Sequence, residues 1–204
     1  VRIPLSSPNI LATKDLKCVI EAYWEEVKED QRYASFDFCY NYFHSHQGNL
    51  VGENMQTSCM QLWSYLASWG MIVRGNEIQS KNYSCLKGVV KYINEHAEFY
   101  NLSIDDTTYV QQMMNLYQGV KSALNFEQPN QKTLITKIIL GVYACCPAMD
   151  SRFTKTFGMS VLKDLREKEI EKIVSFYKSN ESTLKKMQKE SSKKCFSFDG
   201  RSTS

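Results

Sequence analysis

The sequence predicts an all-α protein, folded as a single compact multi-helix domain of seven to nine helices. Apolar residues recur at intervals of three and four along most of the chain, which is the spacing of one face of a helix. With 204 residues, of which 43% are hydrophobic, the chain is long enough for one domain with a real core but short for two. We expect the domain to cover residues 13–190, with an N-terminal extension over 1–12 and a flexible tail over 191–204.

The first expected helix begins after Thr13, because threonine is a common helix cap and apolar residues follow at helical spacing. These apolar residues are Leu16, Ile20, Tyr23 and Val27. The next segment, SFDFCYNYFHSH, fits two patterns, since its aromatic residues alternate as in a strand and also form a helical stripe. No other segment is a convincing strand that could pair with it, so we expect a helix here too.

Turn residues divide the rest of the chain into further helices. Gly70 and Pro147 mark two turns, and Pro129 interrupts the chain between them. The expected helices cover about 55–69, 84–100, 103 or 106 to 124, 130–142, and 150–158. A last helix lies within the charged stretch 163–194, which holds ten Lys and Arg residues and six Asp and Glu residues. Such interleaved charges are typical of a solvated helix face.

Composition narrows the class of protein. The formal net charge of +3 is a mild excess that neither requires nor excludes a nucleic acid partner. Nucleic acid and protein therefore both remain possible partner classes. The chain has no run of about 18 apolar residues, so we predict no membrane association. Its seven cysteines are odd in number and scattered, which predicts reduced thiols and a cytoplasmic location.

The sequence predicts neither a cofactor nor a metal. It lacks a Gly-rich phosphate loop and the HExxH, GxSxG and Walker patterns. His44 and His46 stand two positions apart, whereas two metal ligands on one helix need a spacing of three or four. Cys145 or Cys146 with His96 would be a nucleophile and base, but no local signature supports that pair.

Two turns supply the candidate ligand-binding residues. A helix ending at Trp69 and Gly70 is followed by Arg74, whose guanidinium suits a phosphate or carboxylate. In the alternative interpretation, Trp69 is a core residue, Gly70 is a helix stop and Arg74 pairs with Asp150. Tyr143 and Arg152 flank the second turn, at Pro147, and complete the set that we expect to bind a ligand.

Lys137 and Asp150 are the candidate catalytic residues. A helix carrying Lys137, then Pro147, then Asp150 before a short helix resembles the closing part of the helix-hairpin-helix DNA glycosylase superfamily. That resemblance implies a lysine that attacks the sugar C1′ and an aspartate that assists it. The family's glycine-containing hairpin is replaced here by EQPNQKTLIT. The alternative is that Asp150 caps the short helix and Lys137 is a solvated side chain.

Three further blocks resemble a family of uncharacterised, mostly bacterial hypothetical proteins. The blocks read CYNYF, SCMQLWSYLASWGMIVRG and TKIILGVYACCPAMDSRF. The resemblance spans about residues 33–180 and implies one compact fold, but no activity. From the residues themselves we predict a cytoplasmic binding module for a macromolecule or a small anionic ligand. The alternative is a glycosylase-like DNA-binding or DNA-repair enzyme that uses Lys137 and Asp150.

Overall fold

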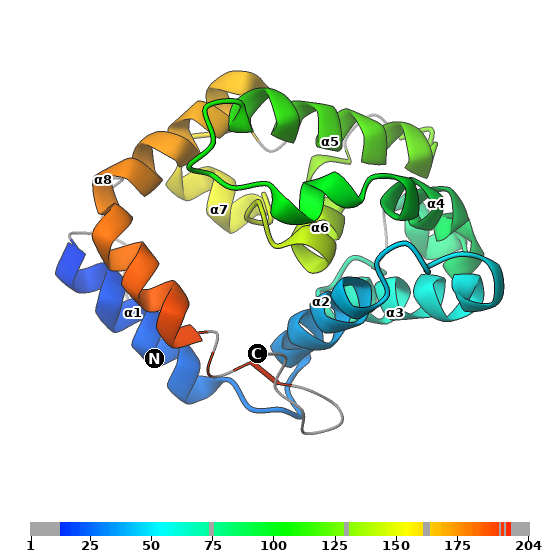
Figure 1. Cartoon of the computed structure of the whole chain (residues 1–204), viewed down its shortest axis with the longest axis horizontal. Coiled ribbons are helices and arrows are strands. Elements are labelled where there is room, and N and C mark those ends of the chain that lie inside the picture. Colours follow the sequence, from blue (N-terminus) through cyan, green and yellow to red (C-terminus); the bar gives the residue numbers. More distant parts are fainter. Residues whose placement is uncertain are drawn as a thin grey trace.

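A computed structural model of the protein describes residues 13–73, 76–128, 131–160, 164–191, 193 and 195–196. The described residues form eight α-helices and no strand (Figure 1). The helices are α1 (Thr13–Glu26), α2 (Ser35–Ser45), α3 (Met55–Ser68), α4 (Lys87–Glu95), α5 (Tyr109–Leu124), α6 (Lys132–Tyr143), α7 (Ser151–Thr156) and α8 (Glu167–Ser191). The predicted fold class and number of helices are confirmed.

The ambiguous aromatic segment is helical, as predicted. It forms α2, which buries Cys39 and Phe43 on one face and leaves the alternate aromatic residues partly exposed. The helix expected over 84–100 is instead interrupted at His96, whose backbone leaves the helical region (φ −125°, ψ 56°). A 3₁₀ segment, η5 (Ala97–Asn101), follows the break. The change of direction seats Phe99 in the core, which a continued α-helix would not do.

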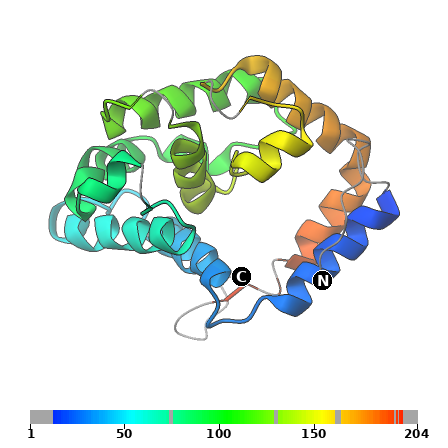
Figure 2. The ribbon, with the colours of Figure 1, turned by 180° about the vertical axis from the view of Figure 1, so that it is seen from behind.

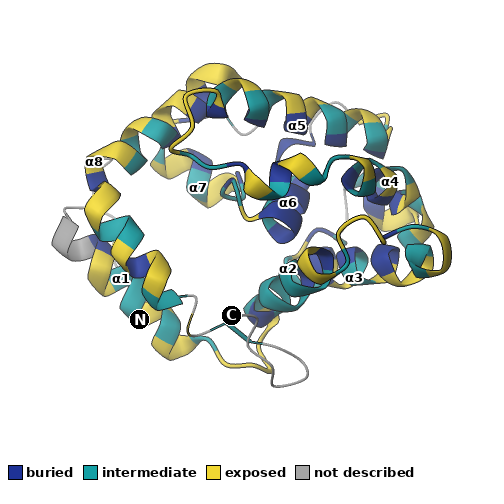
Figure 3. Cartoon of the chain, in the orientation of Figure 1, coloured by how far each residue is buried: buried dark blue, intermediate teal, exposed yellow. Residues whose placement is uncertain are grey.

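Helix α6 is the centre of the domain. It packs against α2, α3 and α5, and most of its length is buried, as the dark ribbon in Figure 3 shows. Gly141 lets α3 approach it closely, since a Cβ atom at this position would lie 2.4 Å from a ring carbon of Tyr65. The Tyr65 hydroxyl donates to the backbone oxygen of Lys137 at 3.0 Å. This contact holds α3 and α6 in register, and both helices carry residues of the site described below.

The first and last helices lie side by side at one edge of the molecule (Figures 1 and 2). Helix α8 packs on α5 over one part of its length and on α1 over another. Within the predicted tail 191–204, Phe196 is bonded to α2. Its N–H donates to Asp37 Oδ2 at 3.0 Å, and its carbonyl accepts from Asn41 Nδ2 at 3.0 Å.

Helices of membrane-spanning length and hydropathy are not found in the described part of the chain. Helix α8 is long enough to span a bilayer, but charged residues occur throughout it. The polar character of this helix agrees with the solvated face predicted from its interleaved charges.

Candidate functional site

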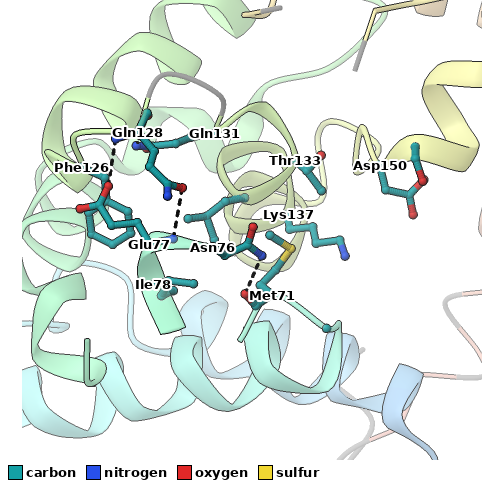
Figure 4. A pocket seen from close by; sticks show the side chains of 13 residues that line it. Met71, Asn76, Glu77, Ile78, Phe126, Gln128, Gln131, Thr133, Lys137 and Asp150 are labelled. Atoms are coloured by element: carbon teal, nitrogen blue, oxygen red, sulfur yellow. Dashed lines mark hydrogen bonds between the residues drawn. The ribbon is translucent and has the colours of Figure 1, made fainter. Parts of the chain in front are cut away.

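The two turns singled out in the sequence border one cavity of about 300 Å³ (Figure 4). We call it the Lys137 cavity. It is lined by Gly70, Met71, Asn76, Glu77, Ile78, Phe126, Gln128, Gln131, Thr133, Leu134, Lys137, Asp150 and Ser151. These residues come from the end of α3, the segment after it, the α5–α6 connection, α6 and the start of α7. The site therefore depends on the tertiary packing around α6.

The end of α3 is shaped by a glycine in the left-handed region. Gly70 has φ +71°, and the next residue, Met71, donates its N–H back to Leu66 O at 2.9 Å. This arrangement is the Schellman motif, which ends a helix by reversing the chain direction. The Trp69 carbonyl at this end has no partner within the helix and accepts instead from Lys137 Nζ at 2.6 Å.

Lys137 is buried, with 7% of its surface exposed, so the alternative prediction of a solvated side chain is wrong. Burial lowers the pKa of its ammonium group below the ordinary value of 10.5; nearby Asp150 opposes this shift and Arg32 adds to it. No described carboxylate forms an ion pair with Lys137, although Asp150 lies on the same side of the cavity. The ammonium group is thus a partly buried cation held by one carbonyl oxygen.

A second buried lysine on the same helix, Lys132, has a counter-charge and a second hydrogen-bond acceptor for its ammonium group. Lys132 is 2% exposed, and its ammonium lies 3.2 Å from both carboxylate oxygens of Glu169. It also donates to the carbonyl of Ser160. Glu169 accepts in addition from the backbone N–H of Arg166 at 3.2 Å. Buried charges are normally paired in this way, and Lys137 departs from that pattern.

Asp150 is the N-cap of α7, as one of the two interpretations of the sequence predicted. Its Oδ1 accepts from the backbone N–H groups of Arg152 at 3.0 Å and Phe153 at 2.9 Å. Both bonds fall on the same oxygen, and Oδ2 receives no hydrogen bond from a described residue. One carboxylate oxygen is therefore left to accept from a molecule in the cavity.

The opposite end of the cavity is a polar rim that joins two loops. The Glu77 N–H donates to Gln128 Oε1 at 3.2 Å, and the Gln128 N–H donates to Glu77 Oε2 at 3.0 Å (Figure 4). Gln131, 7% exposed, donates to the Gln128 carbonyl at 2.7 Å. Its own Oε1 is buried and has no hydrogen-bond partner among the described residues. Buried acceptors are rarely left in this state without a ligand or water to fill it.

Of the predicted ligand-binding residues that the structure describes, Tyr143 and Arg152 do not line the Lys137 cavity. Tyr143 is buried at the far end of α6, where its ring packs against Phe99 and Tyr100, and it lines no described cavity. Arg152 is exposed on α7 and contributes its backbone N–H to the Asp150 cap. Arg74 lies outside the described residues.

The cysteines differ in burial in the part of the chain that the structure describes. All seven are free thiols, and Cys39, Cys59 and Cys146 are buried. Burial raises the pKa of Cys145 to about 12, which leaves almost no thiolate at neutral pH. No group of three or more His, Cys, Asp or Glu side chains among these residues is placed to hold a metal ion.

Chemically, the Lys137 cavity offers one cation, the Lys137 ammonium, and one acceptor, Asp150 Oδ2, beside apolar residues that include Leu134 and Met71. Sequence reasoning identified Lys137 and Asp150 but missed Gln131, because a glutamine before a helix carries no distinctive pattern. No protein-family model, curated protein sequence or solved structure matches this chain.

Proposed function

We propose that this protein binds a small monocarboxylate that also carries a hydrogen-bond donor, in the Lys137 cavity. The observation that supports the proposal most directly is the buried ammonium of Lys137, which has a carbonyl partner but no described counter-charge. A buried cation is normally paired, and a ligand carboxylate would supply the missing anion. Ligand pockets of small molecules begin at about 300 Å³, which is the size of this cavity.

The charges around the cavity favour a monoanion over a dianion. Glu77 and Asp150 both line it, and each would repel a second negative charge on the ligand. Asp150 Oδ2 needs a donor rather than an acceptor, so the ligand should carry a hydroxyl or an ammonium group beside its carboxylate. A 2-hydroxy acid or an amino acid has this combination of groups.

A matched series of three-carbon acids tests the proposal by isothermal titration calorimetry. We expect lactate or L-alanine to bind about fivefold more tightly than propionate, because only they carry a donor for Asp150 Oδ2, and one hydrogen bond contributes about 1 kcal/mol. Inorganic phosphate should bind more weakly than lactate because of the two lining carboxylates. Affinity should fall as the pH rises through the lowered pKa of Lys137, since the neutral amine attracts no anion. Equal affinity for propionate and lactate, or no binding by any acid, would contradict the proposal.

The wider prediction included a macromolecular partner and a cytoplasmic location. The low exposure of Lys137 supports a small ligand over a macromolecule, because a protein or nucleic acid surface cannot reach a side chain that is 7% exposed without a rearrangement. The free cysteines support a reducing compartment as part of the same proposal.

A glycosylase-like activity is a second candidate, favoured by one observation. Lys137 shares its cavity with Asp150, and burial lowers its pKa toward that of a nucleophilic amine. If Lys137 attacks the sugar of an abasic site, borohydride should trap a covalent adduct with abasic duplex DNA. Lys137→Met should abolish the adduct while exposed Lys91→Met leaves it intact. The absence of an adduct with the unaltered protein would eliminate this candidate without affecting the monocarboxylate proposal.

A further inference from the structure

A second cavity, of about 520 Å³, includes Trp69 in its lining, whereas the Lys137 cavity does not. We call it the aromatic cavity, because six of its lining residues carry aromatic rings. It is lined by Tyr23, Trp24, Val27, Tyr33, Phe36, Asp37, Trp69, Leu140, Ser191, Cys195 and Phe196. These residues come from α1, α2, α6, the end of α8 and the segment bonded to α2 near the C-terminus.

Three of the rings form a connected wall from separate parts of the chain. The ring centroids of Tyr23 and Tyr33 are 6.4 Å apart, and those of Tyr33 and Trp69 are 5.6 Å apart with an interplanar angle of 78°. Tyr23 is 47% exposed, which is unusual for a residue with so much apolar surface. Aromatic rings brought together at an accessible cavity present their electron-rich faces to whatever enters it.

Asp37 is the one carboxylate among the lining residues, and that lining holds no Lys, Arg or His. Its Oδ2 accepts from the Phe196 N–H at 3.0 Å, and no described cation forms an ion pair with it. Burial raises the pKa of Asp37, and burial together with the charge of Asp37 raises the pKa of Tyr23. The aromatic cavity therefore contains a negative charge without a positive partner among the described residues.

We propose that the aromatic cavity binds a small quaternary ammonium compound. A cation over an aromatic face is attracted by the ring quadrupole, and alkylated ammonium groups are the ligands that clusters of aromatic rings recognise best. Asp37 supplies the complementary charge, and the volume suits a small molecule. Inorganic cations and primary ammonium groups are held in water by strong hydration, whereas a methylated ammonium group loses little on entering an apolar site.

Two rings of the wall already have a cation of the protein near them. The Arg32 guanidinium lies 4.5 Å from the centroid of Tyr33, and Lys137 Nζ lies 5.8 Å from the centroid of Trp69. These contacts show that both rings attract a cation, but the same charges repel a third cation. The preference of the cavity for a cationic over an uncharged ligand therefore depends on the charge of Asp37. Asp37 is the residue to substitute in a test.

The test compares choline with 3,3-dimethyl-1-butanol, its uncharged isostere, by isothermal titration calorimetry on the full chain. We expect choline to bind at least tenfold more tightly than the alcohol, which corresponds to 1.4 kcal/mol. Asp37→Asn keeps an oxygen to accept from the Phe196 N–H but removes the charge, so it should reduce the preference for choline to less than threefold. Tyr23→Leu should weaken choline binding by several fold, and Tyr177→Leu, which is outside the cavity lining, should not change it.

Each result decides the proposal. Equal affinities for choline and the alcohol would mean that the cavity is merely apolar, and no binding of either would mean that it is not a ligand site. Unchanged choline binding in Asp37→Asn would also overturn the proposal, provided that its melting temperature matches that of the unaltered protein. The Lys137 cavity is tested with carboxylates, so failure of one proposal does not count against the other.

Discussion

Replacing Lys132 by methionine is expected to lower the free energy of unfolding by about 3–5 kcal/mol at pH 7, as urea denaturation would measure it. The change removes the ammonium group that lies 3.2 Å from both oxygens of Glu169, whose side chain is 3% exposed. The carboxylate would then keep only the exposed Arg166, 3.7 Å away, as a counter-charge, and the Ser160 carbonyl would lose its donor. Leaving a buried charge uncompensated is among the most destabilising single changes a protein undergoes.

Two companion variants show whether the loss comes from the unpaired charge. The double change Lys132→Met with Glu169→Leu should recover most of the lost stability, because an apolar pair of similar volume often replaces a buried ion pair at little cost. Arg166→Met removes the exposed partner of Glu169, 3.7 Å away, and should cost less than about 1 kcal/mol. A double variant as unstable as Lys132→Met alone would show that packing, rather than charge, sets the effect.

Lys137→Met is expected to weaken lactate or L-alanine binding by about 10- to 100-fold while changing the free energy of unfolding by less than about 1 kcal/mol. The affinity falls because a charge-assisted hydrogen bond contributes about 1.5–3 kcal/mol. Stability changes little because two effects oppose each other. The variant loses the bond to the Trp69 carbonyl, and it also no longer buries an ammonium group without a described counter-ion. Calorimetry and urea denaturation on the same preparations measure both quantities.

The contrast between the two lysines is the control. They lie on one helix and are both buried, so a general intolerance of methionine at these positions would affect them alike. A loss of 3 kcal/mol or more in Lys137→Met would mark Lys137 as a structural residue and contradict its assignment as a ligand contact. Lys91→Met, at an exposed position of α4, is the control for the loss of one positive charge from the protein.

The pH dependence of stability provides an independent check on Lys137. Because burial lowers its pKa in the folded state, the unfolded chain binds more protons between that lowered pKa and 10.5. Stability contributed by this group therefore rises with pH across that window and is constant below it. The Lys137→Met variant should lack this rise when the two proteins are compared at several pH values.

Local patterns predicted the helices because each apolar face repeats at helical spacing, and the capping role of Asp150 could be read from its place before a short helix. The pattern did not predict that Lys137 is buried. A lysine on an apolar helix usually extends to water, and only the packing of α6 between α2, α3 and α5 excludes that. The unpaired Gln131 oxygen and the Glu77–Gln128 bridge join segments distant in sequence, so no local signal marks them.

Trp69 is connected to both cavities, because its carbonyl accepts from Lys137, which lines one, and Trp69 itself lines the other. Where a ligand in either cavity shifts the backbone at Trp69, it also changes the other cavity. The two binding equilibria are then thermodynamically linked. Such linkage is reciprocal: the factor by which choline alters lactate affinity must equal the factor by which lactate alters choline affinity.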